Sequence, residues 1–414
     1  MGYTKRAIKG VSWMSIFRVV TRILSFLRIA VLARVLTPSQ FGVFGIAALV
    51  LSLLEVFTET GINIFLIQKK DQANGYISSA WFVSIIRGSL IYLILILSAP
   101  FIVNFFNSPD SYKVLILIAI VPLVRGFINP SIINIQKDIQ FHKEFYLRSV
   151  LLVVDASVAI ISAFITKSAE SFAYGLIASA VIEVILSFIL FKPLPKLSFE
   201  LDKIKHIIGR GWWITLTGIF SYFADNGDNV TVGRILGISS LGLYQVAYKI
   251  STLTISEVVE VVNKVTFPVY SKFADDRRRL FRAFLKVTSL SSMIAMLVGV
   301  IIFIFAKQIV LIIAGANWLT VVPVVQVLAI YGIIRTVFAN FSVLFLSLDK
   351  QDYVAKMTFC RVSALAIAII PFVNSYGLMG AAYAMIFSIL VEIPVILYFT
   401  YRFFGKSIFK LSVA

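Results

Sequence analysis

Apolar residues along this chain gather into long runs that are separated by short polar pieces. Twelve of the runs are long enough to cross the hydrocarbon core of a bilayer as helices, which takes about 20 residues each. They cover residues 11–34, 41–67, 79–106, 112–135, 146–166, 171–191, 211–233, 241–268, 283–306, 319–347, 354–374 and 378–403. The shorter apolar piece at 307–318 predicts a segment lying at the membrane interface. The pattern predicts an all-α polytopic membrane protein with about twelve transmembrane helices.

Lysine and arginine are unevenly distributed among the pieces that join these runs. If the N-terminus lies inside, each inside piece carries two to six of them, whereas each outside piece carries at most one. Cytoplasmic loops of membrane proteins are enriched in Lys and Arg. The distribution therefore predicts a multi-pass protein with both termini in the cytoplasm. It also accounts for the net charge of +18, which in a soluble protein would suggest nucleic-acid binding.

A short motif occurs twice, 200 residues apart. The stretch RVLTPSQFG at Arg34–Gly42 has a counterpart, RILGISSLG, at Arg234–Gly242, and each joins the first and second apolar runs of its half. Such self-similarity indicates a duplicated unit, and in a membrane chain it suggests two repeats with a site between them. We expect an N-terminal six-helix bundle at 1–191, a cytoplasmic linker at 192–210, and a C-terminal bundle with a short cytoplasmic tail at 211–414.

Composition narrows the classes of function. Hydrophobic residues form 59% of the chain and charged residues 14%, which a soluble protein of this length would not show. The single cysteine, Cys360, allows no internal disulfide, and we expect neither a metal site nor a cofactor. No cleavable signal peptide is expected, since the first run contains arginines and lacks a cleavage site. The chain has no Gly-rich phosphate loop and no paired aspartates near a histidine, so we expect no direct ATP use and no enzyme activity.

Charged side chains recur inside the predicted helices, where they are costly and mark functional sites by default. One face of the first helix carries a polar stripe with Arg28 at its edge: Ser15, Arg18, Arg22 and Ser25. Similar stripes occur on the second and eighth helices, and the seventh carries two acids and two amides. The further charged residues singled out inside the helices are Glu55, Glu59, Arg125, Asp155, Asp225, Asp228, Lys249, Glu257, Glu260 and Arg335.

These charges have a structural alternative. Arg18 or Arg22 could pair with Glu55 or Glu59 and simply hold helices together. For the whole set we favour a shared water-filled interior, because four polar stripes lie on the first and second helices of both halves. Arg87 and Glu392 lie near predicted helix ends, and we interpret them as anchors that reach the membrane surface.

The two halves differ in the sign of these charges. The first helix is basic, whereas its counterpart, the seventh, is acidic. Guanidinium groups bind phosphate through paired hydrogen bonds, so the basic side suits an anionic substrate. Carboxylates and amides on the other side suit a small cation or a proton relay.

The N-terminal run resembles the polysaccharide flippases of the multidrug/oligosaccharidyl-lipid/polysaccharide exporter superfamily. The similarity is carried by Gly10, the arginine-bearing first helix, the motif Arg34–Gly42, and Gly61. It implies two six-helix bundles related by pseudo-twofold symmetry around a central cavity, opening alternately to each side. It also implies a cargo of undecaprenyl-pyrophosphate-linked oligosaccharide, moved from the inner to the outer leaflet of a bacterial inner membrane.

The resemblance also implies roles for residues. Arginines lining the N-terminal half of such proteins face the pyrophosphate, which matches Arg18, Arg22 and Arg28 by position on the first helix. Arg125, Lys249 and Arg335 are further candidates for substrate binding. Relatives are coupled to Na⁺ or H⁺ through acidic residues, for which Asp225 or Asp228 is the match. The other candidates for cation coupling are Glu55, Glu59, Asp155, Glu257 and Glu260.

Three interpretations remain open at this stage. A lipid-linked oligosaccharide flippase is the first, with membrane lipids around it and a polysaccharide polymerase and chain-length proteins as partners. The second is a cation-coupled multidrug exporter of the same fold, against which the basic first helix argues. The third is a membrane-embedded glycosyltransferase or acyltransferase, for which we find no catalytic constellation.

Overall fold

The protein is seen in a computed structural model. Its described residues are 20–21, 23–59, 62, 66, 75–137, 141–197, 200, 212–272 and 276–408. Several side chains within these helices, Glu257 and Glu260 among them, also lie outside the description.

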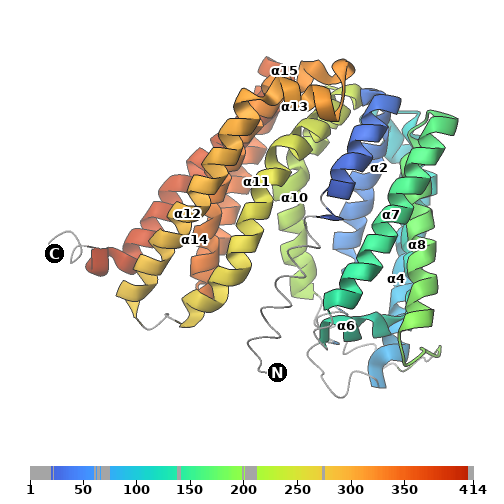
Figure 1. The fold of residues 1–414 in the computed structure, drawn as a ribbon, viewed down its shortest axis with the longest axis horizontal. Coiled ribbons are helices and arrows are strands. Elements are labelled where there is room, and N and C mark those ends of the chain that lie inside the picture. The colour runs from blue at the N-terminus through green and yellow to red at the C-terminus, as the bar shows by residue number, and fades with distance from the viewer. Residues whose placement is uncertain are drawn as a thin grey trace. The chain divides into compact units, whose positions relative to one another are not determined.

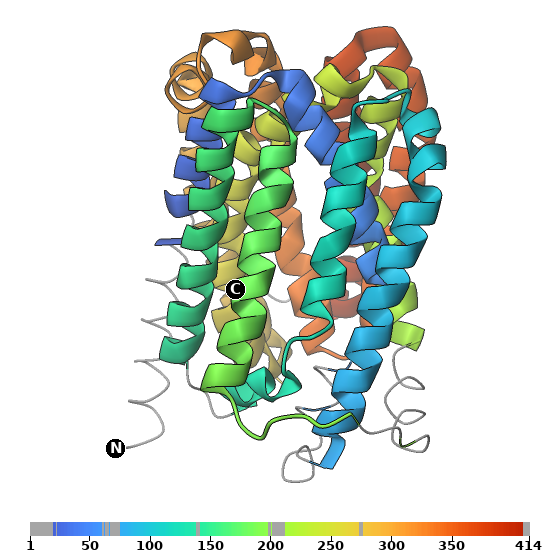
Figure 2. The same cartoon turned by 90° about the vertical axis from the view of Figure 1, so that its right-hand side faces the viewer.

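The first half of the chain forms a set of long helices (Figure 1). The first helix covers residues 20–35 apart from residue 22. The following long helices are α2 (Pro38–Phe57), α4 (Ile77–Phe106), α5 (Ser111–Arg125), α7 (Phe141–Thr166) and α8 (Glu170–Leu190). Between α5 and α7 lie two short elements, η2 (Pro130–Ile133) and α6 (Asn134–Lys137). Figure 2 shows α4 (blue) beside α5 (cyan) and α7 beside α8 (both green). The two helices of each pair pack against each other, and α5 also packs against α8.

The second half repeats this organisation. Its long helices are α10 (Trp212–Ile235), α11 (Ile238–Lys272), α12 (Arg277–Ile304), α14 (Val322–Ser347) and α15 (Gln351–Ile408). The last of these contains two helices that meet at Gly377, where φ is 58° and ψ is −135°. Between α12 and α14 lie α13 (Ala306–Ile313) and η3 (Ala316–Val321), which confirms a short separate element near 307–318. With α15 counted as two, the described parts of each half supply six long helices, and the predicted fold class is confirmed.

Seven helices in the described part of the chain are long and apolar enough to cross a membrane. They cover Pro38–Phe57, Ile77–Phe106, Lys143–Thr166, Glu170–Leu190, Arg277–Ile304, Ala316–Ser347 and Gln351–Gly405. Large apolar side chains such as Phe101 and Ile165 project outward from them, with 76% and 78% of their surface exposed. Exposed apolar surface of this kind suits contact with lipid tails.

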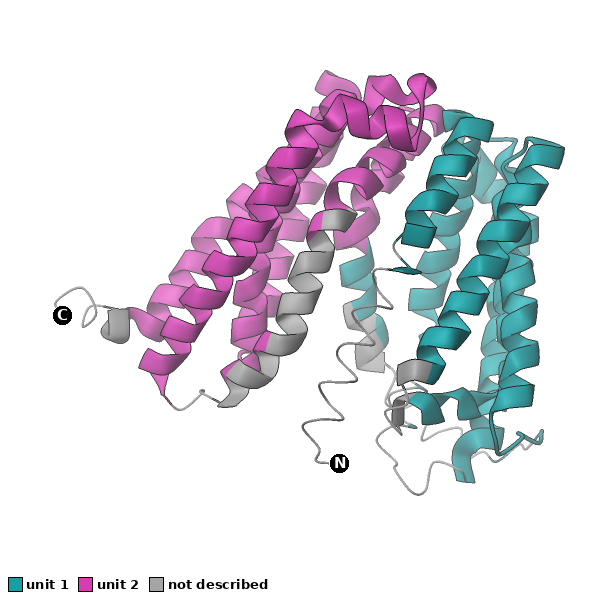
Figure 3. Cartoon of the chain, in the orientation of Figure 1, with its two compact units in different colours: residues 1–222 teal, residues 223–414 magenta. Residues whose placement is uncertain are grey.

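The structure divides into two compact units, residues 1–222 and 223–414 (Figure 3). The division falls inside α10, because the first part of that helix is hydrogen-bonded to residues of the first unit. The Thr215 hydroxyl donates to the Glu59 carbonyl at 2.7 Å, and the Tyr222 hydroxyl donates to the Leu49 carbonyl at 2.7 Å. Most of the predicted linker at 192–210 lies outside the described residues, so the predicted domain boundaries stay a prediction.

The duplicated motif forms the same corner in each unit. Helices end at residues 35 and 235, and the next ones begin at Pro38 and Ile238, so the offset of 200 residues also holds for the structure. In the first corner the Thr37 side chain and Gln40 form a reciprocal N-terminal cap of α2. In the second, Gly237 lies at the same place with φ at 85°, a conformation that glycine adopts readily.

One predicted helix is too long. The apolar run 112–135 was expected to cross the membrane without interruption, but α5 ends at Arg125. Beyond Gly126 the chain turns, and the Asn129 amide nitrogen donates to the carbonyls of Phe191 and Pro193 at 3.1 and 3.4 Å. These tertiary hydrogen bonds replace the helical ones, so an apolar run alone could not reveal the break.

Candidate functional site

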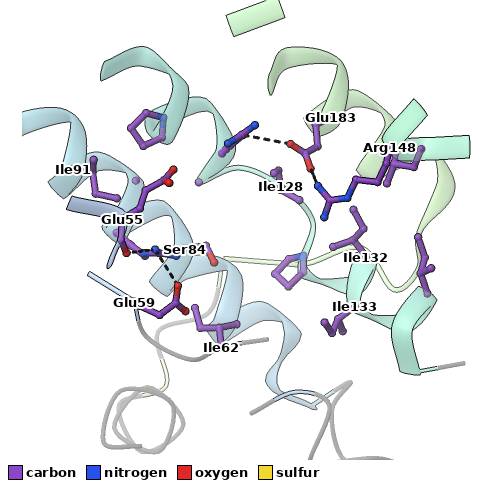
Figure 4. A pocket seen from close by; sticks show the side chains of 18 of the residues that line it. Glu55, Glu59, Ile62, Ser84, Ile91, Ile128, Ile132, Ile133, Arg148 and Glu183 are labelled. Atoms are coloured by element: carbon purple, nitrogen blue, oxygen red, sulfur yellow. Dashed lines mark hydrogen bonds and ion pairs between the residues drawn. The ribbon is translucent and has the colours of Figure 1, made fainter. Parts of the chain in front are cut away.

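Charged side chains gather around a cavity inside the N-terminal unit. The cavity has a volume of about 280 Å³ and lies among α2, α4, α5, α7 and α8. Seven charged residues line it: Glu55, Glu59, Arg87, Arg125, Glu144, Arg148 and Glu183. Figure 4 shows Glu55 and Glu59 on one side, with Glu183 and Arg148 on the other. The sequence analysis singled out Glu55, Glu59 and Arg125, and the fold brings them to one cavity.

Arg87 binds the C-terminal end of α2. Its guanidinium donates to the Glu55 carbonyl at 2.7 Å and to the Thr58 hydroxyl at 3.2 Å, and it forms an ion pair with Glu59 at 3.4 Å. The interpretation of Arg87 as a surface anchor is therefore wrong. The alternative pairing of Glu59 with Arg18 or Arg22 concerns two residues that lie outside the described part of the chain.

Two arginines share one carboxylate on the opposite wall. Glu183 of α8 is 8% exposed and lies 3.4 Å from Nε of Arg125 and 3.7 Å from a terminal nitrogen of Arg148. These distances exceed the 2.7–2.9 Å that is typical of strong charge-assisted hydrogen bonds. The turn after α5 positions Arg125, because Asn129 fixes that turn to the end of α8.

A second buried ion pair joins the first helix to α7. Arg28 lies 2.9 Å from Asp155, with 18% and 9% of the two side chains exposed, and the guanidinium faces the Phe172 ring. The backbone of α8 comes close here, since a Cβ added at Gly175 would meet Asp155 atoms at 2.6 Å. Arg28 and Asp155, predicted to serve cargo and cation respectively, are thus partners of each other.

The C-terminal unit holds a cluster around Arg335 on α14. One terminal nitrogen lies 3.1 Å from Asp225, and the other donates to the hydroxyls of Tyr248 and Tyr331 at 3.2 and 3.4 Å. Arg335 and Asp225 had been predicted for different roles, substrate binding and cation coupling. The tyrosines were missed, although Tyr331 stands four residues before Arg335, a spacing that puts two side chains on one helix face.

Asp228 is fully buried one turn after Asp225. It accepts hydrogen bonds from the Tyr244 hydroxyl at 2.8 Å and from the Asn229 backbone at 2.8 Å. The two aspartates therefore have different surroundings, because one faces Arg335 and the other is enclosed by uncharged donors.

A further pair lies in α15, where Glu392 is 3.9 Å from Arg361 and only 7% exposed. The interpretation of Glu392 as an anchor at the membrane surface is also wrong. The pair joins the two helices that meet at Gly377, so its role is visible only once those helices are folded against each other.

Several candidate residues from the sequence analysis are not part of the charged clusters described above. Arg18 and Arg22 lie outside the described residues, as do the side chains of Glu257 and Glu260. Lys249 is half-buried on α11. Within the described part, no group of three or more His, Cys, Asp or Glu side chains is placed to hold a metal ion. The sequence analysis assigned no role to Glu183 or Arg148, so their pairing was missed.

Comparisons with known proteins agree with this fold. Residues 31–323 match the family model described as polysaccharide biosynthesis protein. The lipopolysaccharide biosynthesis protein WzxC of Escherichia coli strain K12 is 22% identical over 89% of this chain and 76% of its own length.

Solved structures share the fold at low sequence identity. The lipid II flippase MurJ in an inward closed conformation has a TM-score of 0.76 and 18% identity, covering 93% of this chain and 87% of its own. An inward-facing MATE multidrug transporter of the MOP superfamily has a TM-score of 0.75 and 15% identity, covering 92% and 94%.

These matches confirm two predictions made from the sequence. The fold is that of multi-pass membrane transporters, and the relatives are transport proteins rather than enzymes. The family model spans well over half of the chain, from within the first helix to the beginning of α14. The chain therefore belongs to the polysaccharide biosynthesis protein family.

Proposed function

We propose that the protein is a flippase that moves undecaprenyl-pyrophosphate-linked oligosaccharide repeat units from the inner to the outer leaflet of the cytoplasmic membrane. Transport proceeds by alternating access and is coupled to a Na⁺ or H⁺ gradient. Membership of the polysaccharide biosynthesis family is the observation that carries this proposal. Both termini lie in the cytoplasm, and a polysaccharide polymerase acts on the delivered units.

The charged interiors of the two units support this assignment. Arginines and carboxylates are placed inside both helical units, where a purely structural interior would be apolar. Guanidinium groups such as those of Arg28 and Arg335 suit a pyrophosphate, because their planar N–H groups match two phosphate oxygens at once. Asp225 and Asp228 supply the carboxylates for the coupling cation.

A cation-coupled multidrug exporter is the second candidate, since the MATE transporter has nearly the same TM-score as the lipid II flippase. Because both solved structures are less than 20% identical to this chain, their similarity shows a shared fold and does not by itself favour either function. Four arginines inside the described helices, Arg28, Arg87, Arg125 and Arg335, oppose a cationic drug as cargo. The oligosaccharide flippase fits these charges better.

The decisive experiment uses purified protein in proteoliposomes. Undecaprenyl-pyrophosphate-linked oligosaccharide is incorporated, and sugar exposed on the outer leaflet is removed with an impermeant glycosidase. Transport renews the exposed pool, so we expect a Na⁺ or H⁺ gradient to increase the fraction digested. Vesicles without protein are the control. An unchanged digested fraction, together with gradient-driven export of a cationic dye, would favour the drug exporter.

A further inference from the structure

The cavity of the N-terminal unit has an unpaired acid on one wall. Glu55 lines the cavity, and its carboxylate forms no hydrogen bond or ion pair with any described residue. Its neighbour Glu59 is paired with Arg87, whose remaining hydrogen bonds go to the Glu55 carbonyl and Thr58. Among the described residues, the Glu55 carboxylate therefore has no direct hydrogen-bond partner on the α2 side, and the positive charges that act on it come from Arg125 and Arg87.

The opposite wall carries two arginines around one buried carboxylate, with Glu144 one turn before Arg148 on α7. Arg125 and Arg148 share the single carboxylate of Glu183 at 3.4 and 3.7 Å. No other described residue accepts a hydrogen bond from either guanidinium, and Nε of Arg125 is buried without a hydrogen bond. A buried donor left without an acceptor is costly, so an oxygen-bearing anion would be stabilised at this wall.

The rest of the lining is apolar. Besides Ser84, isoleucines from five segments contribute to it: Ile62, Ile91, Ile128, Ile132, Ile133 and Ile135. In Figure 4, Ile132 and Ile133 lie below Arg148, and Ile62 lies beside Glu59. A wall of this kind excludes a fully hydrated ion and accommodates methylene carbons, so it favours an amphiphile over free phosphate.

Size and charge together narrow the ligand. A cavity of about 280 Å³ is smaller than most pockets for drug-sized molecules and far too small for an oligosaccharide. Its lining carries three arginines and four glutamates, so an anion alone would face Glu55 and a cation alone would face Arg125. A small group with one positive and one negative charge can place the positive charge near Glu55 and the negative charge near Arg125.

We propose that this cavity binds the headgroup of a zwitterionic phospholipid with a primary amine, as in phosphatidylethanolamine. The phosphodiester accepts hydrogen bonds from Arg125 and Arg148, and the ammonium donates to Glu55. The isoleucines contact the ethylene and glycerol carbons. This site concerns a membrane lipid and goes beyond the proposed function, since lipid binding to the purified protein is measured without cargo or transport.

Native mass spectrometry of the full-length protein in detergent tests the site directly. Dioleoyl forms of phosphatidylethanolamine, phosphatidylcholine and phosphatidylglycerol are titrated separately, so that only the headgroup differs. We expect the first bound phosphatidylethanolamine to have a Kd about fivefold lower than either of the others. Phosphatidylcholine lacks N–H donors for Glu55, and phosphatidylglycerol lacks the positive charge.

Variants separate the two walls. Glu55→Gln should remove the preference for phosphatidylethanolamine over phosphatidylglycerol, and Arg148→Gln should weaken binding of both lipids about fivefold or more. Glu392→Gln is the control, because Glu392 is a buried acid that is paired with Arg361 in the other unit. It should leave all three affinities unchanged.

Three outcomes would overturn the proposal. Equal affinity of the wild type for the three lipids would remove the zwitterion specificity. An unchanged preference in Glu55→Gln together with unchanged affinities in Arg148→Gln, with both proteins monodisperse on size exclusion, would place lipid binding elsewhere. Binding of soluble O-phosphoethanolamine as tight as that of the lipid would show that the apolar wall contributes nothing and that the ligand is a free metabolite.

Discussion

At the scale of single residues, the described charges inside the helices are mostly paired. Arg28 with Asp155, Arg87 with Glu59, and Arg335 with Asp225 each bring together helices that are distant in the sequence. Taking charges out of water is costly, and the cost is recovered only when a partner lies close by. The contacts around Arg335 and Asp228 give two predictions that can be checked.

Arg335 should depend on its planar guanidinium. Arg335→Lys keeps the charge but loses the fork that reaches Asp225, Tyr248 and Tyr331 together. We expect Arg335→Lys to reduce stability and Arg335→Gln to reduce it further, measured by SDS unfolding of the purified protein. In a double-mutant cycle, Arg335→Gln and Asp225→Asn should show a coupling of about 0.5–1 kcal/mol. Additive effects would mean that the ion pair contributes no stability.

Asp228 and Asp225 are predicted to differ in cation coupling. Asp228 is enclosed by neutral donors, so its carboxylate is free to bind a cation, whereas Asp225 is neutralised by Arg335. We expect Asp228→Asn to abolish the gradient dependence of transport in proteoliposomes and Asp225→Asn to reduce it less. Tyr244→Phe removes one hydrogen bond but keeps the carboxylate, so it should retain the dependence. Full dependence in the double aspartate variant would leave these residues a packing role only.

At the scale of elements, helix caps and glycines determine where helices begin and how closely they approach one another. Gly88 on α4 faces the end of α5, where an added Cβ would lie 2.3 Å from the Pro122 carbonyl oxygen. Gly126 allows the reverse approach, since a Cβ there would lie 2.9 Å from the Ser84 carbonyl oxygen. These two glycines let the backbones of α4 and α5 touch beside the charged cavity.

Gly88→Ala should therefore disrupt the N-terminal unit. Overpacking of this kind costs about 1–3 kcal/mol, and the backbone atoms it meets cannot move aside like a flexible side chain. Gly227→Ala is the control, because no atom lies within 4 Å of a Cβ built on that helical glycine. It should be neutral or stabilising by up to about 1 kcal/mol. SDS unfolding measures both, and equal stability of the two variants would contradict the close contact.

At the scale of the whole molecule, the predicted topology awaits a direct test. In a Cys360→Ser background, single cysteines at Asp110 and Asn374 should react with an impermeant thiol reagent added to intact cells. Cysteines at Lys143 and Asp352 should react only after the membrane is opened. All four positions are exposed, whereas Ser108 is buried, so a cysteine at Ser108 should stay unreactive in both conditions. Labelling with the opposite sidedness would exclude both termini being inside.

The sequence by itself determined the architecture. Long apolar runs predict helices because a backbone in lipid must satisfy its own hydrogen bonds, and the repeated motif located two equivalent corners 200 residues apart. It also identified most of the charged residues inside the helices, because a charge within an apolar run is conspicuous at any position.

Only the tertiary structure decided which charges meet. Glu183 with Arg125 and Arg148, and Arg335 with Tyr248, are contacts between different helices, and helical periodicity fixes the face on which a residue lies but not its partner. The end of α5 at Arg125 has the same origin, since the Asn129 amide nitrogen donates a hydrogen bond to the Phe191 carbonyl at the end of α8. The lack of a hydrogen-bond partner for the Glu55 carboxylate among the described residues likewise becomes visible only in the fold, because it depends on which side chains of α4, α5 and α8 lie beside it.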